Sequence, residues 1–267
     1  MGRSNAYIVA FMVAVCVVCS ALVSGAAVLL SERQQVNVLR DRQKNVLIAA
    51  GLLGRKDKPS DAEIERLVES RIEMRVVRLE DGELAEDIDP RTYDARRAAQ
   101  DPNRRVEIGE NRAGLVAIPE YQHVYFIRDG EELEGVVLPI SGRGLWSTLH
   151  GYLALDVDLT TVRGIAFYEH GETPGLGGEV DNERWRASWR GRRAFDDEGE
   201  PAIHLVKGHA GPVESDPHEV DGLSGATITA KGVTGLVQFW LGERGFGPFL
   251  SKLEQERHEG QPREEAR

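Results

Sequence analysis

Cysteine is almost absent from this chain of 267 residues, and its scarcity excludes several kinds of site. The two cysteines, Cys16 and Cys19, both lie in an apolar stretch near the N-terminus. Disulfides, iron–sulfur clusters and cysteine-ligated zinc are therefore excluded from the rest of the chain, and c-type haem lacks its Cys-x-x-Cys-His motif. Cys16 and Cys19 share one helix face, a spacing compatible with intersubunit metal ligation but more typical of small buried hydrophobic residues.

The motifs of nucleotide-binding and hydrolytic enzymes are also missing. The sequence has neither a phosphate-binding loop nor a dinucleotide fingerprint, so we expect the chain to bind neither ATP nor NADH and not to be catalytic alone. It shows no nucleophile–base triad, and we predict no catalytic residue. The scattered histidines His204, His209 and His218 form no convincing ligand set, and we predict no metal site.

Positive charge is in short supply. The chain has 33 lysines and arginines against 44 acidic residues, a net charge of -11, with no basic run interleaved with aromatic residues. Nucleic-acid binding is therefore not expected. Because the acidic residues are dispersed and the mean hydropathy is -0.35, most of the chain is predicted to be a water-soluble globule with a solvated acidic surface.

The sequence contains one long hydrophobic run, residues 7–30, which has no charged residue. As a helix it would span roughly 36 Å, enough to cross a bilayer. A cleaved signal peptide is the alternative. However, the run is longer than the apolar core of a signal peptide, and Arg3 is the only basic residue before it. We predict a tail at 1–6 and a retained transmembrane helix at 7–30. The flanking basic residues favour a cytoplasmic C-terminal part by the positive-inside rule.

The remainder is predicted to be an α+β domain with an antiparallel sheet and flanking helices. Residues 31–112 are expected to be a helical and connecting region, with a capping box formed by Ser60 and Glu63 at one helix start. Asp129–Gly130 marks a hairpin turn between two apolar segments, residues 124–127 and 135–139. Strands are expected at 74–77, 124–127, 135–139, 152–157, 162–168 and 203–206, and helices at 182–189, after residue 227 and at 248–256. Residues 257–267 are predicted to be a polar tail.

The most informative motif is Asp-Gly-Leu-Ser-Gly-Ala-Thr at residues 221–227. Its first half has turn chemistry, and apolar residues follow at helical spacing, so the motif opens an amphipathic helix. The free N–H groups and positive dipole end of such a helix start favour phosphate. The alternative is that Ser224 and Thr227 cap these N–H groups, which is the more frequent arrangement when the motif is considered alone.

Two further segments accompany this motif. Gly-Arg-Gly-Leu-Trp-Ser occupies residues 142–147, and His-Gly-Glu-Thr-Pro-Gly-Leu-Gly-Gly occupies residues 170–178. Asp-x-x-Ser-Gly-Ala-Thr resembles the acceptor sequence at which a flavin transferase joins FMN to threonine through a phosphoester. Behind one membrane segment, the three motifs together resemble the NqrC family, a flavoprotein component of the Na⁺-translocating NADH:quinone oxidoreductase.

The resemblance implies one covalent FMN per chain, held as phosphothreonyl-FMN at Thr227 in an FMN-binding domain at 113–256. Thr229 is the rival acceptor. Trp146 is either a core anchor or an aromatic wall beside the flavin, and Lys207 is either a cation for the flavin or an ordinary solvated lysine. The other candidate cofactor-binding residues are Leu145, Ser147, Glu172, Thr173, Leu176, Gly177, Ser224, Gly225 and Ala226.

The implied function is that of a membrane-anchored flavoprotein that relays electrons in a complex coupling NADH oxidation by ubiquinone to sodium export. Its partners would be the other subunits, a flavin transferase for maturation and membrane lipid. The resemblance places the soluble domain on the periplasmic side of the bacterial inner membrane, against the charge bias, and we follow the resemblance. The RnfG component of the Rnf ferredoxin:NAD⁺ complex and an anchored flavin-binding sensor are the alternatives; the Gly-Leu-Trp-Ser segment and the long N-terminal half favour NqrC.

Overall fold

The computed structural model describes residues 5–54 and 57–260, with the side chains of that range except those of residues 29, 31–39 and 260. The chain divides into two compact units, Met1–Arg42 and Gln43–Arg267. Helix α1 (Asn5–Ala49) begins in the first unit and ends in the second.

The first unit contains the predicted apolar helix. Within α1, the segment Asn5–Val28 has 24 residues and a mean hydropathy of 2.7, and none of its most apolar window is buried within the chain. A helix of this length and composition is long enough to cross a bilayer. The exposed apolar side chains need a nonaqueous surrounding, which fits a single-pass membrane anchor.

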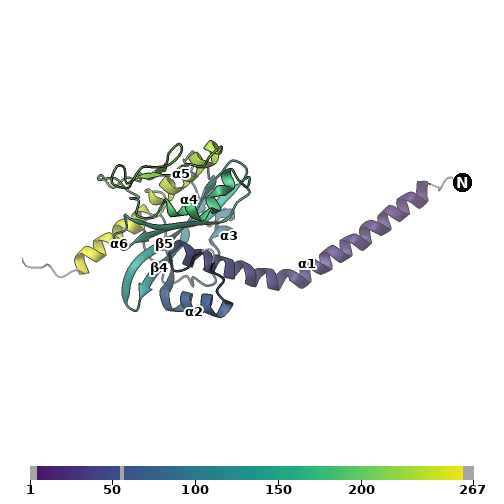
Figure 1. The fold of residues 1–267 in the computed structure, drawn as a ribbon. Coiled ribbons are helices and arrows are strands. Elements are labelled where there is room, and N and C mark those ends of the chain that lie inside the picture. Colours follow the sequence, from purple (N-terminus) through teal and green to yellow (C-terminus); the bar gives the residue numbers. More distant parts are fainter. Residues whose placement is uncertain (1–4, 55–56, 261–267) are drawn as a thin grey trace, which may run out of the picture. The chain divides into compact units, whose positions relative to one another are not determined.

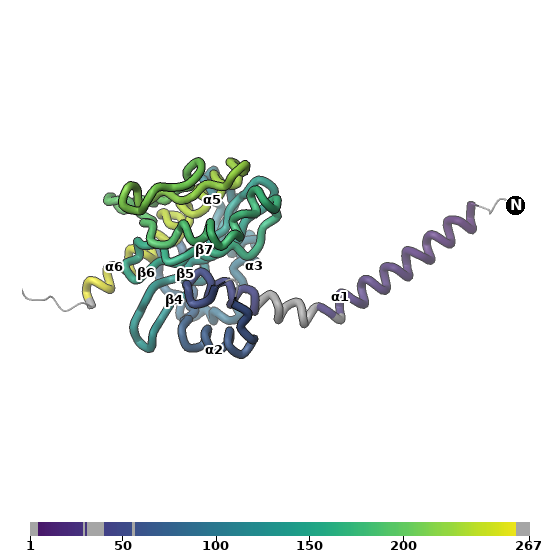
Figure 2. The backbone as a smooth tube through the Cα atoms, viewed as in Figure 1, coloured from purple at the N-terminus to yellow at the C-terminus, as the bar shows by residue number. Residues whose placement is uncertain are grey.

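The second unit is built on a five-stranded antiparallel sheet with the strand order β1-β4-β5-β6-β7. Figure 2 shows the last four of these strands running side by side. The predicted turn at Asp129–Gly130 is confirmed, since it joins β4 to β5 and Gly130 has a positive φ of 60°. The strands are β1 (Ile72–Arg78), β4 (Tyr121–Asp129), β5 (Glu132–Arg143), β6 (Thr148–Asp156) and β7 (Val162–Glu169).

Both faces of the sheet are buried, so its strands alternate between two cores. Along β5, Val136 and Leu138 face one core whereas Val137 faces the other. Helices α5 (Thr227–Leu241) and α6 (Gly247–Gly260) contribute to the first core, and the end of α1 contributes to the second. Figure 1 shows α5 and α2 (Asp61–Arg71) on opposite sides of the sheet.

The short elements lie between these main ones. The region expected to be helical and connecting also supplies β1, the edge strand of the same sheet. The predicted capping box at Ser60 and Glu63 is confirmed at the start of α2. The remaining elements are α3 (Ala95–Gln100), β2 (Arg105–Glu107), β3 (Ala117–Pro119), η1 (Gly177–Asp181), α4 (Glu183–Ala187), β8 (His204–Leu205) and β9 (Glu219–Val220).

Helix α5 packs directly on β5 because glycines replace side chains at the contact. A Cβ at Gly232 would lie 2.4 Å from the carbonyl oxygen of Arg143, and one at Gly142 would lie 2.4 Å from Cβ of Leu236. Real Cβ atoms do not approach so closely, so larger residues would push the helix off the strand. This contact fixes the start of α5 beside the end of β5.

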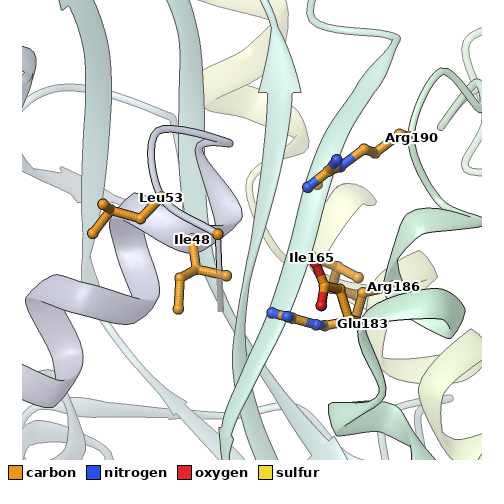
Figure 3. Close-up of a pocket in the computed structure, with 8 residues that line it drawn as sticks. Ile48, Leu53, Ile165, Glu183, Arg186 and Arg190 are labelled. Atoms are coloured by element: carbon orange, nitrogen blue, oxygen red, sulfur yellow. The ribbon is translucent and has the colours of Figure 1, made fainter. Parts of the chain in front are cut away.

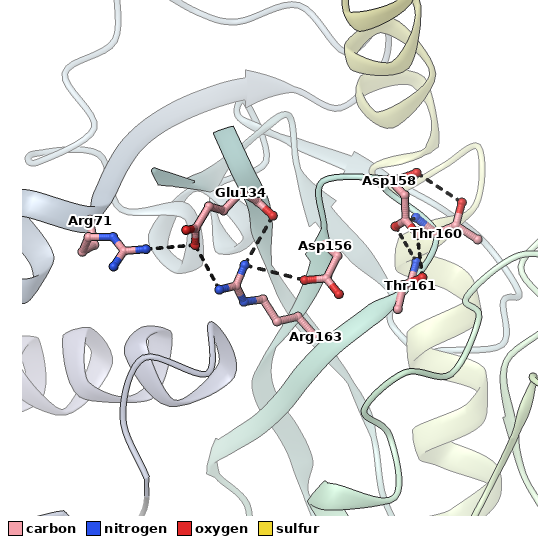
Figure 4. Close-up of polar contacts among 7 residues, drawn as sticks. All are labelled: Arg71, Glu134, Asp156, Asp158, Thr160, Thr161 and Arg163. Atoms are coloured by element: carbon pink, nitrogen blue, oxygen red, sulfur yellow. Dashed lines mark hydrogen bonds and ion pairs between the residues drawn. The ribbon is translucent and has the colours of Figure 1, made fainter. Parts of the chain in front are cut away.

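Charged side chains join elements at the rim of the sheet (Figure 4). One carboxylate oxygen of Glu134 accepts hydrogen bonds from Arg71 at 2.9 Å and from Arg163 at 3.0 Å. Glu134 thereby links the end of α2 to strands β5 and β7. In the turn between β6 and β7, the Asp158 carboxylate accepts from the N–H groups of Thr160 and Thr161. These contacts brace the sheet at places without predicted site residues.

Candidate functional site

Residues 221–227 form an exposed turn between β9 and α5. Gly225 has φ 68°, in the left-handed region where glycine is favoured. Leu223 and Ala226 are buried and anchor the turn, whereas Ser224 and Thr227 are exposed. The turn therefore presents both hydroxyl groups to solvent at the helix start.

No side chain in the described part of the chain caps helix α5. Its N-cap residue is Ala226, which has φ -130° and ψ 50°, and the first turn holds no acidic residue. The alternative in which Ser224 and Thr227 cap the helix is therefore wrong. Because the first N–H groups of a helix have no partner within it, an uncapped, exposed start suits a bound anion.

The two threonines near this start are in opposite environments. Thr227 is exposed, but Thr229 is only 1% exposed and its hydroxyl donates to Oε2 of Glu172 at 2.5 Å. A group that modifies a threonine must reach its oxygen. The geometry thus favours Thr227 over Thr229 as an acceptor.

The loop between β5 and β6 presents apolar side chains to solvent. A hydrogen bond from the N–H of Gly144 to the carbonyl of Ser147 closes it as a tight turn at 2.8 Å. Trp146 is 70% exposed and Leu145 is also exposed. Exposure on this scale excludes the core-anchor role for Trp146, and the role of an aromatic wall stays a prediction.

The glycine-rich loop after β7 reaches the acceptor turn. A Cβ on Gly225 would lie 2.9 Å from a methyl carbon of the exposed Leu176, so these two residues are neighbours. The carbonyl of Thr173 accepts from the N–H groups of Leu176 and Gly178, which curls the loop. Thr173 itself is exposed. The structure thus brings one predicted ring-contact residue, Leu176, beside the predicted acceptor turn.

Glu172 differs from the other candidates because it is buried, with 5% of its surface exposed. It accepts hydrogen bonds from the Thr229 hydroxyl and from the N–H of Trp146 at 2.9 Å. Burial opposes its charge, but these bonds and those from the N–H groups of Leu145 and Ser147 outweigh burial. The pKa of Glu172 is consequently below its ordinary value, and the carboxylate is ionised at neutral pH.

Ser147 provides a second connection between the same two loops. Its hydroxyl oxygen accepts from the N–H of Gly171 at 2.6 Å. At the base of the glycine-rich loop, Nε2 of His170 lies 3.2 Å from a carboxylate oxygen of Asp181. Side chains of both loops therefore fix their relative positions before any ligand is considered.

Lys207 lies in a loop next to the acceptor turn. The N–H of Gly222 donates to the carbonyl of Gly208 at 2.7 Å, and the Asp221 carboxylate accepts from the N–H of Ala210. Nδ1 of His209 lies 2.9 Å from the same carboxylate. The Lys207 side chain is exposed. Its position fits both a cation near the acceptor and an ordinary solvated lysine.

Sequence reasoning missed two features of this site. Ile228, next to Thr227, is 58% exposed, so a large apolar side chain lies in solvent beside the predicted acceptor. Its position off the apolar face of α5 was a usable signal, because a large aliphatic residue on the solvent side needs another partner. The pairing of Glu172 with Thr229 had no local signal, since 57 residues separate them.

A separate pocket lies between the end of α1, strand β7 and α4 (Figure 3). Its lining combines aliphatic side chains from the end of α1, the residues after it and β7 with charged side chains from α4 and from Arg190. None of these residues was predicted to bind the cofactor, so the pocket is distinct from the acceptor site. They are Ile48, Leu53, Gly54, Gly164, Ile165, Glu183, Arg186 and Arg190.

Comparison with known proteins assigns the region around the predicted acceptor turn to a protein family. Residues 144–242 match the family model of the FMN-binding domain. Over 91% of its length the chain is 46% identical to the NqrC protein of the Na(+)-translocating NADH-quinone reductase of Yersinia pestis, covering 90% of that protein. The corresponding Pseudomonas aeruginosa protein is 45% identical over 90% of this chain and 92% of its own.

A solved structure shows that the fold is shared as well. The crystal structure of NqrC from Shewanella oneidensis superposes with a TM-score of 0.74 at 34% identity. The match covers 81% of this chain and 98% of the crystallised one. The α+β fold with an antiparallel sheet, predicted from the sequence, is thereby confirmed.

Proposed function

This chain belongs to the NqrC family of the Na⁺-translocating NADH-quinone reductase, and we propose on that premise that it carries one FMN bound covalently to Thr227. The single observation that carries the proposal is the position of Thr227. It is an exposed hydroxyl at the first residue of an uncapped helix, directly after the acceptor motif. The competing hydroxyl of Thr229 is buried and hydrogen-bonded.

The residues around Thr227 fit FMN. The open start of α5 offers N–H groups and a positive dipole end to a phosphoester, and exposed Lys207 adds a nearby positive charge. Trp146 and Leu176 offer apolar surface to a planar aromatic ring. Thr173 supplies an exposed hydroxyl for the ring edge. Ser224, Gly225, Ala226, Leu145, Ser147 and Gly177 complete the proposed flavin surroundings.

Attachment requires a second enzyme. Forming the phosphoester joins Oγ1 of Thr227 to the phosphorus of an activated flavin: the hydroxyl gives its proton to a base, and the bond between the phosphorus and its activating group breaks as that group leaves. A threonine hydroxyl is a weak nucleophile without a base, and Thr227 has no hydrogen bond to a carboxylate or histidine in the described part of the structure. A flavin transferase would therefore supply both the base and an activated flavin.

Within the complex, the bound flavin would supply reversible electron transfer, and this chain would supply its position and surroundings. The exposure of Trp146, Leu176 and Ile228 indicates that the site is open to solvent. A covalent link would keep the cofactor in place there. An open site allows a neighbouring protein of the complex to approach closely enough for electron transfer. We therefore assign the chain the role of an electron relay between other subunits, in a complex that couples NADH oxidation by ubiquinone to sodium export.

Mass spectrometry tests the attachment. The full chain, co-expressed with a flavin transferase, is expected to gain the mass of one FMN minus one water, on the tryptic peptide that contains Thr227. Thr227→Ala should abolish the gain, and the matched variant Thr229→Val should retain it. Flavin on Thr229, or flavin retained in Thr227→Ala, would contradict the assignment.

We also propose that α1 anchors the chain in the bacterial inner membrane, with the residues from Ser31 onward on the periplasmic side. The apolar segment Asn5–Val28 supports the anchor. Orientation is tested by fusing alkaline phosphatase after Glu256, which is active only outside the cytoplasm. An inactive phosphatase together with a bright fluorescent protein at the same position would place the domain in the cytoplasm.

A further inference from the structure

One buried carboxylate connects the segments that make up the proposed flavin site. Oε1 of Glu172 accepts from the N–H of Trp146, in the loop between β5 and β6. Oε2 accepts from the hydroxyl of Thr229, in the first turn of α5. Glu172 itself belongs to the glycine-rich loop after β7. Three segments far apart in sequence therefore meet at a side chain that is 5% exposed.

Two glycines make room for this carboxylate. A Cβ on Gly144 would lie 2.5 Å from Oε1 of Glu172. A Cβ on Gly177 would lie 2.7 Å from Oε2 and 2.6 Å from the Thr229 hydroxyl. These distances are shorter than real Cβ contacts. The carboxylate thus occupies the volume that side chains would otherwise need.

We propose that Glu172 is a positioning residue that sets the surroundings of the flavin without touching it. Three groups assigned to the flavin lie within two residues of a contact with this carboxylate. Trp146 is itself a contact, Leu176 precedes Gly177, and Thr227 lies two residues before Thr229. The inference rests on the proposed function, because those groups are the ones that surround the flavin. It replaces the ring contact predicted for Glu172 from sequence.

The role requires a carboxylate and not merely its volume. The groups found around Glu172 are donors, an O–H and backbone N–H groups. A glutamine has the same shape, but its NH₂ group would face these donors instead of accepting from them. If Glu172 only fills space, glutamine should replace it harmlessly. If it positions the three segments, glutamine should disturb them.

The experiment compares the full chain, co-expressed with a flavin transferase, with the variant Glu172→Gln. Glu179→Gln is the matched control, since Glu179 follows in the same loop and its carboxylate accepts from the side chain of Asn182. Covalent mass at Thr227 should be retained in both variants. The visible absorption maxima and the midpoint potential of the flavin should shift in Glu172→Gln and remain at wild-type values in Glu179→Gln.

A measurement without flavin separates the two proposals. In the chain expressed without the transferase, hydrogen exchange at residues 144–147 and in the first turn of α5 should become faster in Glu172→Gln, while strand β4 keeps wild-type exchange. Thr229→Val removes one donor and keeps the shape, so it provides a second variant should Glu172→Gln not fold. It should give a smaller change of spectrum, potential and exchange.

Unchanged absorption, potential and exchange in Glu172→Gln, or in Thr229→Val if that variant has to replace it, would overturn the positioning role while leaving covalent flavin at Thr227 intact. Conversely, suppose that exchange at residues 144–147 is faster in Glu172→Gln but the chain gains no flavin mass even when co-expressed with the transferase. This result would support the hydrogen-bonded contacts around Glu172 and reject the proposed function.

Discussion

Helices α2 and α5 both begin after a serine-containing turn, but their first turns are completed in different ways. In α2, Ser60 and Glu63 form a capping box, so neighbouring residues satisfy the exposed backbone groups. In α5, the N-cap is Ala226 and no described side chain caps the helix. Its third residue, Thr229, instead points inward to a carboxylate 57 residues earlier. The start of α2 is therefore capped by neighbouring residues. The start of α5 is fixed on its buried side by the Thr229–Glu172 hydrogen bond, and its exposed side has no side-chain cap.

The two glutamates that stabilise these starts show the same contrast. Glu63 is exposed and accepts from the N–H and hydroxyl of Ser60. Glu172 is buried and accepts from residues of two other segments. A helix whose start is fixed by a distant buried group can keep its outer N–H groups available to an anion. That arrangement is what attachment of a phosphate at Thr227 requires.

Removing the buried carboxylate should have the largest effect. Glu172→Ala leaves the Thr229 hydroxyl and the Trp146 N–H buried without an acceptor, which should lower the free energy of unfolding by about 3 kcal/mol. Glu63→Ala should have a smaller effect, because water replaces the lost bonds. Chemical denaturation of the full chain in detergent, followed by fluorescence of the buried Trp185, Trp189 and Trp240, measures both. Equal losses would remove the distinction between the two helix starts.

The glycine beside the carboxylate gives the next largest effect. Gly177→Ala places a methyl group against Glu172 and Thr229, so we expect a loss of about 2 kcal/mol. Gly211→Ala is the control, because a Cβ there meets only Ser215 at an ordinary 3.7 Å. The same denaturation experiment applies. If the two variants are equally stable, the contacts of Glu172 with Trp146 and Thr229 tolerate movement, and Glu172 does not hold these segments in place.

Acid should weaken the hydrogen bonds of buried Glu172 more than those of exposed Glu63. The pKa of Glu172 in the folded chain is below its ordinary 4.5, so its stabilising effect is complete above pH 4.5 and is lost as pH falls through the folded value. The pKa of Glu63 is lowered in the same direction by its bonds to Ser60. Below pH 4.5, the unfolding free energy of Glu172→Gln should therefore depend less on pH than that of the wild type. Glu63→Gln should alter this dependence less, since solvent screens an exposed group; the reverse order would contradict the comparison.

The same contrast explains what could be predicted from sequence. The capping box and the turn at Asp129–Gly130 are encoded within a few neighbouring residues, and both were predicted correctly. The motif at 221–227 and its helix were also recognisable locally.

The long-range features could not be predicted in this way. Whether Trp146 lies in the core or on the surface depends on which segments pack against its loop, and the structure shows it exposed. The prediction that Ser224 and Thr227 cap α5 was wrong because the N-cap residue is Ala226, whose side chain has no hydrogen-bond acceptor. Glu172 was expected beside the flavin ring because the loop that contains it was expected there. Its burial depends on Gly144, Gly177 and Thr229, residues that become neighbours only in the folded chain.

The smallest expected effect distinguishes the two serines. Ser60→Ala removes a real N-cap and should cost about 1 kcal/mol of stability. Ser224→Ala should change the unfolding free energy by less than about 0.5 kcal/mol, because Ser224 is exposed and does not cap α5. Both variants replace serine by alanine just before a helix, so they lose the same side-chain atoms. Thermal and chemical unfolding of the flavin-free chain should therefore separate them. A loss at Ser224 as large as that at Ser60 would mean that Ser224 does cap α5 in solution, and the open helix start on which flavin attachment depends would then be closed before the transferase acts.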